Sequence, residues 1–166
     1  MLRFVVAAIL AAATTPALAQ DPCKAKWPLD NEHELLKARS AVKTASGAGQ
    51  SALPATALDL KLEPAASARM VMPPERAPKA PNSYSGFVRF AGSPRNQTVL
   101  VTLSEEAWID VVQSGRYVKS AAFNSLYECP TMRKSVKFQL APGPFAVQLS
   151  GVTAETIKMT VTPAGE

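Results

Sequence analysis

Apolar and polar residues alternate through most of the chain after Ala57, and this period of two constrains the fold more than any other feature. Leucines alternate with charged residues over 58–63, and the pattern returns over 135–140 and 156–162. Glycines, prolines and serines separate these segments at the short spacing typical of β-sandwiches. We therefore predict an all-β fold over 53–166, a jelly-roll-like β-sandwich of eight or nine strands, with a hairpin at Ser114-Gly115.

A helical period appears only in the segment before this domain, residues 20–52. An apolar stripe with a polar back predicts a short N-terminal helix from 32 to 43, and Asn31 with Glu34 fits a capping box at its start. Such a short helix is marginal alone, so we expect it to pack on the main domain.

A proline-rich connection occupies residues 64–81, where five prolines fall within 18 residues. Proline has no N–H to donate to a strand ladder. We therefore expect an extended surface segment with at most a short edge strand near 68–72.

The N-terminus, residues 1–19, has the pattern of a cleaved signal peptide. Arg3 precedes the uncharged run Phe4–Ala13, and Ala17-Leu18-Ala19 matches the small-x-small cleavage pattern. The run is shorter than the roughly 20 apolar residues that span a bilayer. We expect export to the periplasm, a mature chain starting near Gln20 and no transmembrane segment after cleavage.

The two cysteines, Cys23 and Cys129, form an even pair in a chain predicted to be exported. A disulfide is the interpretation that such a pair favours. Two free thiols and metal ligation are the alternatives. Neither cysteine has a partner at the CxxC spacing of redox motifs.

The formal net charge of +5 comes from basic residues that are scattered along the chain rather than grouped. Nucleic-acid-binding proteins concentrate such residues on one face, so we expect no nucleic-acid partner. The only histidine, His33, cannot supply the two or three imidazoles of common iron or zinc sites. We therefore predict no metal, no cofactor and no catalytic residue.

One local pattern stands out in the segment Ala107–Val112. Alternation places Trp108 and Asp110 on one face of a strand, where a buried carboxylate needs a partner. Arg133 and Lys134 are the nearest candidates. One interpretation is an ion pair or backbone cap that pins the hairpin; the other is a sugar- or small-molecule-binding patch. In that patch Trp108 stacks and Asp110 and Arg133 form hydrogen bonds, and two tyrosines widen it, Tyr117 and Tyr127.

A wider set of segments carries a family resemblance: Ala107–Val112, Gly115, Cys129–Val136, Phe138–Gly143 and Gln148–Gly151, with Cys23 and Trp27 before them. Through them the half Ser85–Pro163 is similar to a family of small exported bacterial proteins of unknown activity. Its β-rich half resembles the jelly-roll sandwich of bacterial pre-peptidase C-terminal domains, which are non-catalytic modules. Some members carry the label homogentisate 1,2-dioxygenase, an enzyme that resembles a cupin and holds Fe(II) with two histidines and a glutamate. Relatives often have a histidine where this chain has residues 121–125.

Three functions follow as expectations. The first is a non-catalytic periplasmic protein that binds an envelope protein or an envelope glycan. The second is a structural or assembly factor of the envelope, in which Trp108 and Asp110 are packing residues. The third is the metal-dependent dioxygenase of the family label.

Overall fold

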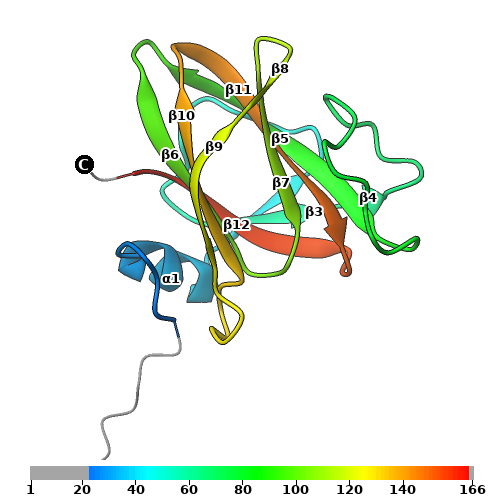
Figure 1. The fold of residues 1–166 in the computed structure, drawn as a ribbon, viewed down its shortest axis with the longest axis horizontal. Helices are drawn as coiled ribbons and strands as arrows, with labels where there is room; N and C mark the ends of the chain where they lie inside the picture. Colours follow the sequence, from blue (N-terminus) through cyan, green and yellow to red (C-terminus); the bar gives the residue numbers. More distant parts are fainter. Residues whose placement is uncertain (1–22, 165–166) are drawn as a thin grey trace, which may run out of the picture.

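The computed structural model describes residues 23–164, and the predicted signal peptide lies outside the described residues. Two β-sheets face each other (Figure 1). Sheet A has the order β1 (Val42–Ala45), β3 (Leu58–Lys61), β12 (Thr156–Pro163), β6 (Gln97–Leu103), β10 (Lys134–Leu140) and β9 (Ser120–Ser125). Sheet B has the order β2 (Gly49–Gln50), β5 (Tyr84–Ser93), β11 (Gly143–Val152), β7 (Trp108–Gln113) and β8 (Arg116–Val118), and β4 (Glu63–Pro64) pairs with β5.

The inward faces of the two sheets form one hydrophobic core. Every second residue of a strand points into this core: Val99 and Val101 of β6 and Val147 and Leu149 of β11 are all fully buried. The prediction of an all-β fold with one short N-terminal helix is confirmed, while the jelly-roll connectivity stays a prediction. No helix among residues 23–164 has the length and apolar character needed to cross a membrane.

The outer face of each sheet is also covered, on opposite sides of the molecule (Figure 1). The helix α1 (Asp30–Lys37) and the segment before it lie on sheet A, where a second hydrophobic cluster joins Leu36 to Leu100. Residues 65–81, which we call the strap, lie on sheet B and are held there by side chains of β7 and β11. The fold therefore has four layers.

The disulfide between Cys23 and Cys129 is confirmed, with the two Cα atoms 4.4 Å apart. Cys129 lies in the connection between β9 and β10, so the bridge fastens the start of the described chain to sheet A. Both cysteines belong to the hydrophobic cluster beneath α1.

The helix prediction was right in kind and wrong in extent. The helix spans 30–37 rather than 32–43, and its N-cap residue Leu29 makes no side-chain cap, so the predicted capping box is absent. The apolar residue Val42 lies in β1, where it pairs with Leu58 in a parallel ladder. Strand pairing here overrides a helical pattern that was only marginal.

The short strand expected near 68–72 in the proline-rich connection was misplaced, and residues 65–67 form a turn. The strand is β4 at Glu63–Pro64, paired with β5, whereas residues 68–72 form no strand. A further strand, β9, was not predicted, because its sequence Ser-Ala-Ala-Phe-Asn-Ser has little β character. Pairing with β10 holds it in the sheet.

Candidate functional site

Two polar side chains on the outer face of sheet B hold the strap. Gln148 of β11 exchanges two hydrogen bonds with the backbone of Met72: its Nε2 donates to the carbonyl at 3.1 Å, and its Oε1 accepts from the N–H at 3.3 Å. The amide thus behaves like one unit of a neighbouring strand. Asp110 of β7 is the cross-strand partner of Gln148 and receives a bond of 3.2 Å from the same Nε2.

Asp110 is 97% buried and accepts three hydrogen bonds from neutral donors. They come from the Trp108 indole N–H at 2.6 Å, the Glu75 backbone N–H at 3.2 Å and the Gln148 amide. The ion pairs within residues 23–164, Lys37–Glu34 and Lys43–Asp59, do not involve it. The predicted ion pair of Asp110 with Arg133 or Lys134 was therefore wrong. Neutral donors satisfy the buried carboxylate instead.

Tyr117 of β8 contributes a further contact to the strap. Its hydroxyl donates to the carbonyl of Pro73. Its pKa is raised above 10.0 by desolvation, and further by the negative charges of Asp110 and Glu75. The hydroxyl therefore stays a donor at neutral pH.

The strap in turn presents a cation to Trp108. The residue after Glu75, Arg76, lies with its guanidinium carbon 5.4 Å from the centre of the Trp108 ring. Lys134, the first residue of β10 in sheet A, places its ammonium 5.3 Å from the same ring and donates to the carbonyl of Ala107 at 3.0 Å. The aromatic ring is thus in contact with two cations from two different layers.

Two adjoining cavities of about 260 and 460 Å³ meet at this ring. Both are lined by five residues that we call the Trp108 cleft: Arg76, Lys79, Glu106, Trp108 and Lys134. The larger cavity continues between the two sheets, where its floor includes Ile109, Val136 and Phe138. The cleft combines an apolar floor, one partly exposed aromatic ring and three cations against two carboxylates, Glu106 and, in the larger cavity, Glu75.

Burial disfavours the charged form of Lys134. Burial lowers the pKa of Lys134 below 10.5, the nearby carboxylate of Glu106 opposes that shift, and the positive charge of Arg76 adds to it. Two cations that repel each other beside one ring favour a bound anion, which would relieve that repulsion.

A larger cavity of about 840 Å³ lies elsewhere, over β6, β9 and β10, with residues such as Gln97, Gln139 and Pro163. Its one charged lining residue is Lys137. It lacks an aromatic platform and a grouped charge, so the Trp108 cleft is the better candidate.

The five residues proposed from the sequence divide into three sets. Trp108 and Tyr127 line the cavities, whereas Asp110 and Tyr117 bind the strap. Arg133 makes up the third set and donates to the carbonyl of Tyr127. The predicted patch is therefore only partly assembled.

Arg76, Lys79 and Glu106 were missed by sequence reasoning. Arg76 and Lys79 belong to the proline-rich connection, which gives no periodicity from which a facing direction could be read. The available signal was the presence of charged residues among closely spaced prolines.

Comparison of this chain with protein-family models, with curated proteins and with solved structures finds no match.

Proposed function

We propose that this protein is a non-catalytic binding protein of the periplasm, and that the Trp108 cleft takes an acidic glycan of the cell envelope. The observation that carries the proposal is the Trp108 ring in contact with both Arg76 and Lys134. An aromatic face packs against the C–H groups of a sugar ring, and adjacent cations bind the carboxylate or phosphate that an acidic sugar bears.

The size of the cleft supports a small ligand group rather than a protein surface. Its larger cavity, about 460 Å³, is within the range of small-molecule sites, whereas stable protein partners cover broad surfaces. The disulfide supports an oxidising compartment. The resemblance to exported proteins with a pre-peptidase-like sandwich agrees with a binding role and is itself part of the proposal.

The dioxygenase activity of the family label is not proposed. A site of two histidines and one glutamate needs a second histidine, and this chain has one. That histidine, His33, lies on α1, away from the Trp108 cleft.

Calorimetry with two oligosaccharides of equal length tests the proposal, one built of uronic acids and one neutral. We expect the acidic oligomer to bind and the neutral one to bind at least tenfold more weakly. Arg76→Gln should weaken binding of the acidic oligomer about tenfold, which is about 1.4 kcal/mol. Arg95→Gln is the matched control, because Arg95 is also an exposed arginine but does not line the cleft. Equal binding of both oligomers, or equal effects of both variants, would contradict the proposal.

A structural or assembly role is the second candidate, and one observation favours it. Asp110, Gln148 and Tyr117 all have their polar groups engaged by the strap, which is the arrangement of a packing site rather than an open one. For that role, Trp108→Ala would lower the melting temperature strongly while binding to every acidic oligomer stays absent. For the binding role, Arg76→Gln retains the melting temperature and weakens the affinity, because Arg76 is exposed and contacts the Trp108 ring.

A further inference from the structure

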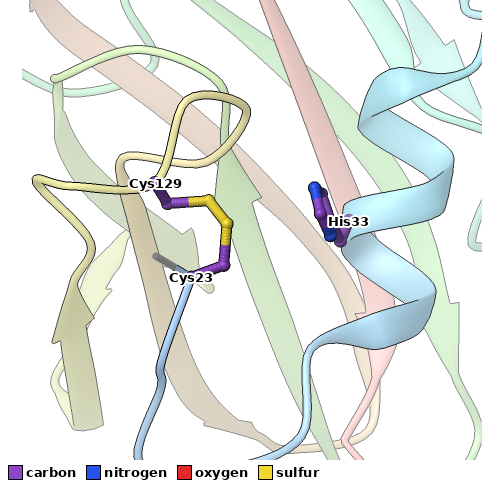
Figure 2. A group of neighbouring side chains, drawn as sticks. All are labelled: Cys23, His33 and Cys129. Carbon is purple, nitrogen blue, oxygen red and sulfur yellow. A yellow bond between two sulfur atoms is a disulfide. The ribbon is translucent and has the colours of Figure 1, made fainter. Parts of the chain in front are cut away.

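The only histidine of the chain faces the disulfide (Figure 2). The imidazole of His33 projects from α1 toward the S–S bond, and a ring nitrogen lies within 4.8 Å of the Sγ atoms of Cys23 and Cys129. The three residues come from three separate segments: the N-terminal segment, α1 and the connection between β9 and β10. The fold has brought together two sulfurs and one imidazole that the sequence keeps far apart.

These groups form a soft set of ligands. Thiolate and thioether sulfur favour monovalent copper, and imidazole also binds copper well. A third sulfur is close, since Met132 is 99% buried and lines the same cavity of about 340 Å³ as Cys23 and His33. In the bridged form the two cysteine sulfurs are bonded to each other and are not thiolates, which are the metal-binding form.

We propose that reduction of the Cys23–Cys129 disulfide converts this cluster into a binding site for Cu⁺, with the two thiolates and His33 as its ligands. The reductant is a dithiol. One of its thiolates attacks Sγ of Cys23, the S–S bond breaks, and the bonding electron pair leaves on Sγ of Cys129. The second thiolate then displaces Sγ of Cys23. The reductant ends as a disulfide, its two protons pass to solvent, and two protein thiolates are available to the metal.

The site stays assembled when the bond opens, because other contacts hold both segments. The backbone N–H of Lys26 donates to Oδ1 of Asn124 at 3.1 Å, which fixes the chain just after Cys23 against β9. The N–H of Cys129 donates to the carbonyl of Leu126 at 3.1 Å and keeps its own turn closed. With the Cα atoms 4.4 Å apart, rotation of the side chains is enough to place both sulfurs on one ion.

Anaerobic titration of the mature protein with Cu⁺, in competition with a coloured Cu⁺ chelator, tests the proposal. We expect one Cu⁺ per reduced protein, no binding to the oxidised protein, and a melting temperature that Cu⁺ raises only in the reduced form. His33→Asn should weaken the affinity of the reduced protein at least tenfold and leave the fold of the oxidised protein unchanged.

Three results would overturn the inference: equal Cu⁺ affinity in reduced and oxidised protein, equal affinity in His33→Asn and the parent chain, or unfolding of the protein whenever the bridge is reduced. A double variant with both cysteines changed to serine is a further check. If it folds, it should bind no Cu⁺, and if it does not fold, the His33→Asn comparison decides.

Discussion

Asp110 shows how a single buried carboxylate fixes a whole segment without any opposite charge. Its three donors are an indole, an amide and a backbone N–H, and two of them come from the sheet that carries it. The third belongs to the strap. Asp110, a candidate ligand group from the sequence, is thus a positioning residue for Arg76, which follows Glu75 in the strap.

Asp110→Asn should lower the free energy of unfolding by about 1–3 kcal/mol, because a carboxamide meets these donors with one N–H₂ group that has nothing to donate to. Urea unfolding measures this. Asp59→Asn is the matched control: Asp59 pairs with an exposed Lys43, and such surface pairs contribute about 0–1 kcal/mol. Equal losses in the two variants would contradict the role given to Asp110.

Asp110→Asn should also change the pKa of Tyr117, which is observable at alkaline pH. The raised pKa of Tyr117 means that the folded protein favours the neutral phenol, so its stabilising contribution is present below pH 10 and is lost as pH rises through the raised pKa. Removing the Asp110 charge should lower the pKa of Tyr117 toward 10. Ultraviolet titration, with Tyr117→Phe to assign the signal, follows the shift. If the pKa of Tyr117 is the same in Asp110→Asn and in the parent protein, the charge of Asp110 does not act on Tyr117.

At the scale of elements, α1 depends on contacts from the sheet below it. Lys158 of β12 donates to the carbonyls of Leu36 and Ala38, both at 3.1 Å, at the C-terminal end of the helix. Near its other end, the buried Glu32 accepts a hydrogen bond of 2.5 Å from Thr162 of the same strand. A cation at the carbonyl end of a helix also interacts favourably with the helix dipole.

Lys158→Met should therefore loosen α1 while retaining the alkyl part of the side chain. We expect a loss of about 1–3 kcal/mol in stability and faster hydrogen exchange of the α1 amides than of the β12 amides. Lys61→Met, at an exposed lysine on neighbouring β3, is the control and should change neither quantity. Unchanged exchange in α1 would mean that its hydrophobic face alone holds it.

The elements also show what could be predicted from the sequence. Where alternation coincided with a defined turn, the prediction succeeded: the hairpin of β7 and β8 closes through Ser114 and Gly115, both with positive φ, of 52° and 71°. The prediction failed where pairing with a neighbouring strand, rather than the residues' own β propensity, determines the structure, as in β1 and β9. Of the Trp108 cleft, the sequence singled out Trp108, and Lys134 only as a partner of Asp110, because the strap that supplies two of its cations has no periodic pattern.

For the whole molecule, the disulfide is the covalent restraint between distant segments of the chain. It joins residues separated by 106 positions, and on the chain-entropy model a loop of that length contributes about 4–5 kcal/mol. Reduction should lower the midpoint of urea unfolding accordingly, with little change in its slope. A folded protein that is equally stable with and without the bridge would place the stabilising role entirely on the cluster beneath α1.

The bridge also has a consequence for the order in which the molecule is completed. Cys23 leaves the ribosome long before Cys129, so the first cysteine made must wait for a partner that lies beyond nine strands of the fold. Until Cys129 is made this bridge cannot form, and the thiol of Cys23 is open to exchange with other thiols. The Cys23–Cys129 bridge therefore marks a chain that has been made past its ninth strand, and chains that stop earlier would be found in mixed disulfides.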